Sequence, residues 1–381
     1  MQHPGPVRLA ILALLLAVLM PLAVGCGGGG GVKKIGGARS EVVAIAGDTV
    51  TGLAFAPDGR LFISEQNSGD IRILTPDGRL LAEPFAHVEP ARRLEWGLLG
   101  VAVDPDFNVN HYVYAYYTRP APGDSAAPVL VRFTEADNRG NEPEVLIEFP
   151  DIEPGLNPVD VGGGLQFGPD GSLYVSIGDT DRPNLAQDLS SPFGKLLRVT
   201  RDGTPASDNP FAGRADADPM VYAYGFRNAF GFAIDPESGR IYAADNGPSN
   251  CDELNVVEAG EDYGWPRSLA GGEVPCQNPD AKEPVYLYAQ PGKDPQANNS
   301  NVAPTGVAFL SAQTYPKLGD GLLVCEYLTK YIRRLKFDEQ DQTKVTDDSV
   351  VAEDCSVALA ADRRGVIYYS SGLEIHRLVP Q

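Results

Sequence analysis

One stretch of the chain, residues 221–266, holds the side chains whose types and spacing could do chemistry. Arg227 and Asn228 lie in an aromatic, glycine-flanked turn. Asn246-Gly247-Pro248 and the acid pair Asp252-Glu253 follow. A turn needs glycine and proline for unusual backbone angles, but it needs neither an arginine nor an acid pair. The stretch therefore predicts a functional site; a well-ordered loop with structural ion pairs is the alternative.

A recurring phrase indicates which elements position these residues. It consists of small or apolar residues, a turn built on Asp and Gly, and an alternating strand. Clear copies begin at Leu53, Val101, Leu165 and Phe232, and looser copies begin at Val307 and Val357. Each copy predicts a β-hairpin, and further strands follow most copies. Copies spaced roughly 40–85 residues apart, with about four strands each, are typical of a β-propeller.

We therefore expect residues 40–381 to form one all-β domain, a six-bladed β-propeller of four-stranded antiparallel blades. A pair of β-sandwiches is the competing fold. Function on a propeller belongs to the loops at one end of the central channel. The longest loops are the candidate walls of a pocket, and they lie at 119–130, 149–163, 201–219 and 267–303.

The bulk composition limits the partners. The chain has 381 residues, a formal net charge of −20 and a hydrophobic content of 43%, which suits a packed globular protein. The negative charge argues against nucleic acid or an anionic membrane surface as a partner. It is compatible with bound cations, and Ca²⁺ is the expected one.

The N-terminus resembles a targeting segment. Arg8 precedes an apolar run at residues 9–24, which is too short for a comfortable membrane span. The run ends in Ala23-Val24-Gly25-Cys26, which resembles a bacterial lipoprotein cleavage box. In such a box the cysteine, here Cys26, becomes the lipid-bearing first residue of the mature protein.

These features predict a signal peptide at 1–25 and a glycine-rich tether at 26–39. We expect a protein of the bacterial cell envelope, outside the cytoplasm, that contacts the membrane only through a lipid anchor. Simple secretion and an uncleaved anchor are the alternatives.

Four cysteines remain in the exported part, namely Cys251, Cys276, Cys325 and Cys355. An even number in an oxidising compartment predicts disulfides. Of the three possible pairings, Cys251–Cys276 with Cys325–Cys355 is favoured, because each bond closes a short loop. No CxxC pair occurs, which disfavours a zinc site.

Four ordered motifs resemble those of a known family. They lie at residues 95–107 (EWGLLGVAVDPDF), 162–179 (GGGLQFGPDGSLYVSIGD), 194–211 (with GKLLRV, DG and DNPF) and 221–266 (with GFRNAFG, NGP, DELN and YGWP). Together they are similar to the motifs of soluble pyrroloquinoline-quinone (PQQ) sugar dehydrogenases, also called glucose/sorbosone dehydrogenase-like proteins. The resemblance extends over roughly residues 45–380 and implies the same six-bladed fold.

The resemblance implies hydride transfer from the anomeric carbon of a sugar to PQQ. In the family a histidine is the general base, an arginine stabilises charge on the quinone oxygen, and Ca²⁺ polarises the carbonyl. Basic side chains also grip the three carboxylates of PQQ. Arg227 and Asn228 match the quinone-contacting pair, and Glu95 stands where a polar quinone contact is usual.

The resemblance also places calcium in the same stretch. Gly247 and Pro248 match the positions whose backbone carbonyls bind the catalytic ion, and Asn246 replaces a neighbouring glutamine. Glu253 and the carbonyl of Tyr263 resemble a second, structural calcium site. Oxygen ligands of this kind suit calcium.

The sequence departs from the family pattern at three places. The general-base histidine should fall two residues before Gly162, where this chain has Asp160. An aspartate can serve as a base, but its unperturbed pKa of about 3.9 makes it weak near neutrality. The family lysine falls at Leu328, and Lys330 is the nearby candidate for cofactor binding. The family's arginine pair falls near Glu353-Asp354-Cys355, which is acidic.

Three functions therefore remain open. The first is a PQQ- and calcium-dependent aldose dehydrogenase that acts on a small sugar or other polar substrate, with Asp160 as base and Arg227 at the quinone. The second is a non-catalytic propeller that binds a glycan or protein at the cell surface. The third is a calcium-dependent lactonase-type hydrolase, which needs several acids converging on the channel ion. Its candidates are Asp160, Asp179, Glu95 and Asp252.

Overall fold

A computed structural model describes residues 33–266, 276, 278, 280–290, 292–295 and 299–381. The signal segment, Cys26 and the glycine run of the tether lie outside the described residues, as does part of the candidate wall at 267–303. No described helix combines the length and apolar character that crossing a membrane would require.

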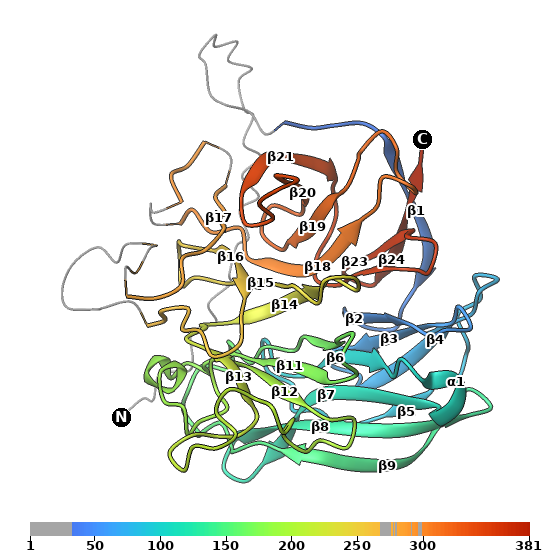
Figure 1. The fold of residues 1–381 in the computed structure, drawn as a ribbon. Helices are drawn as coiled ribbons and strands as arrows, with labels where there is room; N and C mark the ends of the chain where they lie inside the picture. The colour runs from blue at the N-terminus through green and yellow to red at the C-terminus, as the bar shows by residue number, and fades with distance from the viewer. Residues whose placement is uncertain (1–32, 267–275, 277, 279, 291, 296–298) are drawn as a thin grey trace, which may run out of the picture. The chain divides into compact units, whose positions relative to one another are not determined.

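The described chain forms six four-stranded antiparallel sheets, which confirms the predicted six-bladed β-propeller (Figure 1). The first three sheets are β2 (Val50–Phe55), β3 (Leu61–Glu65), β4 (Asp70–Leu74) and β5 (Ala86–His87); β6 (Leu98–Val103), β7 (Tyr112–Ala121), β8 (Ser125–Ala136) and β9 (Arg139–Glu148); and β10 (Leu165–Phe167), β11 (Leu173–Ile177), β12 (Lys195–Val199) and β13 (Val221–Tyr224).

The next two sheets are β14 (Ala229–Ile234), β15 (Ile241–Asp245), β16 (Glu253–Val257) and β17 (Tyr286–Leu287); and β18 (Pro304–Leu310), β19 (Gly321–Glu326), β20 (Ile332–Phe337) and β21 (Val345–Ala352). The sixth is β22 (Leu359–Ala361), β23 (Ile367–Ser371), β24 (Glu374–Pro380) and β1 (Ala38–Ile45). The described helices are one short α-helix, α1 (Phe107–Asn110), and one 3₁₀ turn, η1 (Pro183–Ala186).

The ring closes through the pairing of the two ends of the described chain. β1 runs antiparallel to β24, from Ala38 opposite Pro380 to Ile45 opposite Glu374. The sixth blade therefore contains strands from both ends of the sequence. Such closure protects sheet edges that would otherwise be free to pair with other chains.

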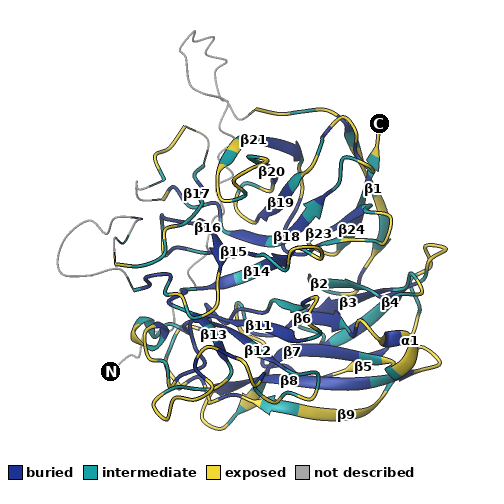
Figure 2. Cartoon of the chain, viewed as in Figure 1, coloured by how far each residue is buried: buried dark blue, intermediate teal, exposed yellow. Residues whose placement is uncertain are grey.

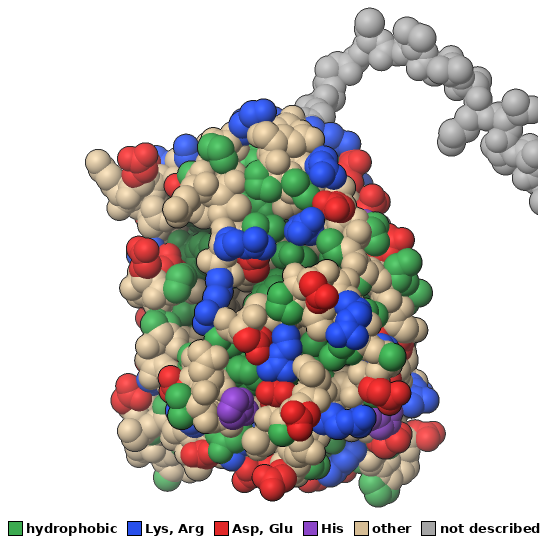
Figure 3. Space-filling model, turned by 90° about the vertical axis from the view of Figure 1, so that its right-hand side faces the viewer, with side chains coloured by type: hydrophobic (Ala, Val, Ile, Leu, Met, Phe, Trp, Pro, Cys, Tyr) green, Lys and Arg blue, Asp and Glu red, His purple; other side chains and the backbone are tan. Residues whose placement is uncertain are grey.

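Burial follows the order of the strands within a blade (Figure 2). The second strands β3, β11 and β15 are buried along their whole length. β9, at the outer edge of the second blade, is mostly exposed. The surface is not uniformly acidic: Figure 3 shows a face on which Lys and Arg side chains lie among acidic and hydrophobic ones.

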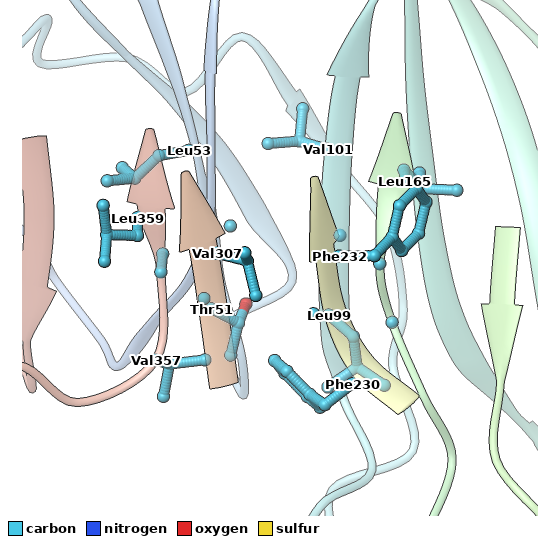
Figure 4. Close-up of a pocket in the computed structure, with 17 residues that line it drawn as sticks. Thr51, Leu53, Leu99, Val101, Leu165, Phe230, Phe232, Val307, Val357 and Leu359 are labelled. Atoms are coloured by element: carbon cyan, nitrogen blue, oxygen red, sulfur yellow. The ribbon is translucent and has the colours of Figure 1, made fainter. Parts of the chain in front are cut away.

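The first strand of each blade faces the central channel, where a narrow cavity of about 90 Å³ remains. Its labelled side chains lie in two tiers (Figure 4). One tier holds Leu53, Val101, Leu165, Phe232, Val307 and Leu359, and the other holds Thr51, Leu99, Phe230 and Val357. The labelled side chains are therefore apolar except for Thr51, and glycine backbone completes the lining of the narrow part of the channel.

The disulfide pairing predicted from loop length is confirmed. Cys251 bonds to Cys276 and Cys325 bonds to Cys355. Residues 221–266 do not all belong to one blade, because β13 is the outer strand of the third blade and β14, β15 and β16 belong to the fourth. The stretch therefore connects two blades.

Close packing between adjacent first strands depends on glycine. A Cβ atom built on Gly231 of β14 would lie 1.9 Å from the carbonyl oxygen of Thr305 in β18, far inside van der Waals contact. The obstructing atom is backbone and cannot turn aside. This position therefore tolerates no side chain without a shift of one blade against the next.

We expect Gly231→Ala to lower the free energy of unfolding by about 1–3 kcal/mol, because overpacking forces backbone shifts. Urea denaturation of the purified protein measures the change. Gly213→Ala is the matched control, since nothing lies within 4 Å of its added methyl group. Equal losses in the two variants would contradict the role given to Gly231.

Candidate functional site

A pocket of about 550 Å³ lies at one end of the channel. Its floor is the tier of Thr51, Leu99, Phe230 and Val357, which it shares with the narrow cavity below. The other lining residues are Thr49, Gln66, Leu94, Glu95, Val159, Asp160, Arg227, Asn228, Asn246, Gly247, Pro248, Asn301, Ala303, Thr305 and Tyr327. A volume of this size is typical of small-molecule sites.

The pocket brings together most of the residues that the sequence singled out. Glu95, Asp160, Arg227, Asn228 and the Asn246-Gly247-Pro248 segment all line it, although they come from four connections: β5–β6, β9–β10, β13–β14 and β15–β16. The structure therefore brings these residues together in one pocket.

Asp160 and Arg227 form its centre. Arg227 Nη2 donates to Asp160 Oδ2 at 2.6 Å, and Arg227 Nη1 donates to the carbonyl oxygens of Asn246 and Gly247 at 3.1 and 3.3 Å. Only 3% of Asp160 is exposed, and its backbone has a positive φ of 56°. The arginine thus joins the acid of one loop to the backbone of another.

Glu95 and Asn228 hold the loop that carries Asp160. Glu95 Oε2 accepts from the Asp160 amide at 2.7 Å and from Asn228 Nδ2 at 3.4 Å. Asn228 Oδ1 accepts from the Gly162 amide at 3.1 Å. Both residues were predicted to contact a cofactor, and the structure adds that they fix the backbone around Asp160.

Burial changes the acid–base chemistry of Asp160. It raises the pKa of Asp160 to about 8; the positive charge of Arg227 opposes the rise, and Asp179, Glu95 and Asp245 add to it. Burial also raises the pKa of Glu95 and raises that of Asp179 to about 6. The objection that aspartate is too weak a base near neutrality therefore does not apply to this aspartate.

Asp179 faces the same cluster from β11's end. Its Oδ2 accepts from Trp265 Nε1 at 2.7 Å, and its amide donates to the carbonyl of Arg227 at 2.7 Å. Trp265 belongs to the Tyr-Gly-Trp-Pro phrase, and its ring centroid lies 5.9 Å from the Arg227 guanidinium carbon. Trp265 therefore contacts both Asp179 and Arg227 and helps to hold the arginine in place.

Sequence reasoning missed Asp245, the last residue of β15. Its two carboxylate oxygens accept from the amides of Arg227 and Asn228 at 3.0 and 2.6 Å, and only 4% of the residue is exposed. The available signal was an aspartate directly before Asn246 at the end of a buried strand. Asp245 therefore holds the backbone of Arg227 and Asn228, and it does not line the pocket.

Glu253 and Tyr263, the predicted second calcium site, do not line the pocket. Glu253 lies buried in β16, where its Oε1 accepts from Asn255 Nδ2 at 3.1 Å. The Tyr263 hydroxyl donates to the carbonyl of Val256 at 2.8 Å. Within the described residues no three His, Cys, Asp or Glu side chains are grouped to hold a metal ion. Calcium there stays a prediction.

Lys330 does not line the pocket either. Its ammonium lies 3.8 Å from the centroid of the Tyr327 ring, which does line it, and burial lowers the pKa of Lys330. Nearby Arg333 is buried and engaged by Glu326 and Asp348. Among the described lining residues Arg227 is thus the single basic side chain.

The donor set of the pocket fits calcium. Asn246 Oδ1 is buried without a hydrogen-bond partner, and the backbone carbonyls of Gly247 and Pro248 lie in the same segment. A carboxylate-bearing quinone would meet Arg227, Asn228 and neutral donors from threonine, glutamine and asparagine side chains. The lining therefore supplies oxygen donors for calcium, and for the quinone it supplies Arg227 and neutral donors beside two acids, Glu95 and Asp160.

A closed six-bladed propeller whose channel mouth holds a pocket lined by Asp160 and Arg227 defines the class of this protein. The family model for glucose / sorbosone dehydrogenase matches residues 48–370, and the chain belongs to that family.

Individual relatives agree with this assignment. The aldose sugar dehydrogenase YliI of Escherichia coli (strain K12) is 27% identical over 315 residues, which cover 79% of this chain and 80% of that protein. Quinoprotein glucose dehydrogenase B of Acinetobacter calcoaceticus is 31% identical over 249 residues, covering 58% and 50%. The PQQ-bound aldose sugar dehydrogenase of Streptomyces coelicolor superposes with a TM-score of 0.71 at 25% identity, covering 90% and 98%.

The raised pKa of Asp160 predicts a pH-dependent stability. The folded state favours the neutral acid, so the stabilisation present below the unfolded pKa of about 3.9 is lost as the pH rises through about 8. We expect Asp160→Asn to remove this loss, on the order of a few kcal/mol between pH 5 and 9. Urea denaturation at several pH values measures it.

Asp58→Asn is the control for this experiment. The hydrogen bonds and charge of Arg60 outweigh burial and lower the pKa of Asp58, so Asp58 stays ionised across this range. A wild-type protein whose stability is unchanged between pH 5 and 9 would contradict the burial of an ionisable Asp160.

Proposed function

We propose that the chain is an aldose dehydrogenase that uses PQQ and calcium, and that Asp160 replaces the family histidine as general base. The observation that carries the proposal is the buried Asp160 carboxyl, paired with Arg227 inside the pocket and having a pKa of about 8. A base needs a pKa near the working pH and reach into the pocket, and Asp160 has both. The aldose sugar dehydrogenases among the relatives support the substrate class.

Asp160 would accept the proton of the sugar hydroxyl as hydride leaves the adjacent carbon. Arg227 orients the Asp160 carboxylate through the 2.6 Å bond and stabilises its ionised form. Glu95 fixes the Asp160 backbone, so that the carboxyl keeps its direction while it gains a proton.

Arg227 and Asn228 would hold the quinone, and Asn246, Gly247 and Pro248 would hold calcium through oxygen atoms. When bound, the quinone supplies the hydride acceptor and calcium polarises its carbonyl. The apolar floor formed by Leu99, Phe230 and Val357 limits water beneath the reacting groups.

The proposal predicts that purified protein loaded with PQQ and Ca²⁺ reduces a dye acceptor with an aldose, and that Asp160→Asn lowers kcat by about 10²–10⁴. PQQ binding should survive in the variant, which calorimetry measures. Asp160→His should restore turnover, because imidazole is the family's base. Absence of both quinone binding and turnover across an aldose panel would remove the proposal.

We also propose that the protein works outside the cytoplasm on a lipid anchor at Cys26. The two disulfides support an oxidising compartment, since such bonds are rare in reducing cytosol. In the native host, Cys26→Ser should move the protein from the membrane fraction to a soluble one on immunoblots. A variant that stays with the membrane would contradict the anchor.

A further inference from the structure

Two segments that both line the pocket are hydrogen-bonded to each other. The first runs from Asn246 to Asp252 and the second includes Pro295 and residues 299–303. The Cys251 amide donates to the Pro295 carbonyl at 3.1 Å, and the Ser300 amide donates to the Ser249 carbonyl at 3.2 Å. The segments are separated in sequence and form one paired unit.

The side chain of Asp252 makes the shortest of these connections. Its Oδ1 accepts from the Gly247 amide at 2.9 Å, and its Oδ2 accepts from the amides of Val302 and Ala303 at 2.5 and 2.8 Å. Asp252 is 0% exposed. One carboxylate thus receives three backbone N–H groups, two from one segment and one from the other.

This arrangement leaves Asp252 no role as an acid facing the pocket. Its oxygens point to backbone amides, and Asp252 is absent from the pocket lining, whereas Gly247 and Ala303 line it. Bonds from amides to an ionised carboxylate are among the stronger hydrogen bonds. Asp252 is therefore placed to fix the separation of the two segments, which we call the calcium-binding wall (246–252) and the Val302–Ala303 wall.

The Gly247 segment has little freedom to compensate. A Cβ atom at Gly247 would lie 1.7 Å from the carbonyl oxygen of Asn250, so the turn is already as tight as backbone allows. The Gly247 N–H shares its peptide plane with the carbonyl oxygen of Asn246, so losing the bond to Asp252 would release that plane and loosen the turn that carries the Gly247 carbonyl. The positions of the Asn246 and Gly247 carbonyl oxygens therefore depend on Asp252, which does not line the pocket itself.

We propose that Asp252 is a positioning residue that sets the spacing of the calcium-binding wall against the Val302–Ala303 wall. The expected effects on calcium binding and turnover rest on the proposed function. The expected effect on amide exchange rests only on the backbone contacts of Asp252. Asp252→Asn keeps the shape of the side chain but turns an N–H donor toward amides that are donors themselves. The two walls then lose their common acceptor.

The test compares wild type, Asp252→Asn, Asp252→Ala and the control Asp104→Asn. Asp104 is also an acid with 1% exposure that accepts from a backbone amide, of Asp106 at 2.9 Å, but it lies in the second blade and does not line the pocket. Calorimetry with Ca²⁺ alone, steady-state kinetics and amide hydrogen exchange are measured on each folded protein.

We expect the Asp252 variants to weaken calcium binding about tenfold and to raise KM, with kcat within about twofold of wild type. Exchange should rise in both 246–252 and 299–305, with Asp252→Ala affected more than Asp252→Asn. Asp104→Asn should change none of these, even where it lowers the melting temperature equally.

Two results would overturn the inference. One is unchanged calcium affinity and KM in a variant that loses stability, which would make Asp252 merely structural. The other is faster exchange in one segment only, which would show that Asp252 does not join the two walls. If wild type binds no calcium and turns over no sugar, the proposed function fails, and the exchange pattern alone decides the role of Asp252.

Discussion

Desolvation of acids at one end of the propeller channel governs the site. Asp160, Asp179 and Asp245 are each no more than 4% exposed, and Glu95 is half-buried beside them. One guanidinium, that of Arg227, faces the group. Since buried carboxylates need donors, the surrounding backbone has to supply them. The loop conformations around the pocket follow from that requirement.

The buried acids obtain their hydrogen-bond donors in two ways. Asp245 takes backbone amides and therefore shapes the chain. Asp160 takes a single side-chain donor and keeps a raised pKa, so it remains able to exchange a proton. Two aspartates of the same cluster thus have different roles, one structural and one reactive. Which role an aspartate takes depends on the groups that its carboxylate oxygens face. The residue type alone does not reveal that role.

This distinction marks how far sequence reasoning reached. The repeated Asp/Gly turn predicted six blades, because turn chemistry and strand alternation are local and survive in each copy. The pairing of Cys251 with Cys276 followed from chain distance in the same way. The family motifs located Asp160, Arg227 and Asn228 in one pocket. These features depend on short stretches of chain.

Properties that depend on how the blades pack together could not be predicted from the sequence. The pKa of Asp160 depends on burial produced by three blades together, so the free-residue value misled. Asp245 looked like the end of a strand, because its two amide partners lie 17 and 18 residues earlier in the chain. The family lysine position falls at Leu328 and Lys330 is the nearby basic residue, but in the structure its ammonium lies over the Tyr327 ring. Local pattern carries no information about such directions.

The two tiers of side chains in the channel limit how a ligand can enter and leave the pocket. Beneath the pocket the axis narrows to a cavity of about 90 Å³, whose labelled side chains are apolar except for that of Thr51 (Figure 4). A cavity of that volume is too small for a sugar or a quinone, whereas the pocket above it measures about 550 Å³. A ligand that fills the pocket therefore cannot leave through the channel, and where two groups bind one above the other, the group against the floor has to enter first and leave last.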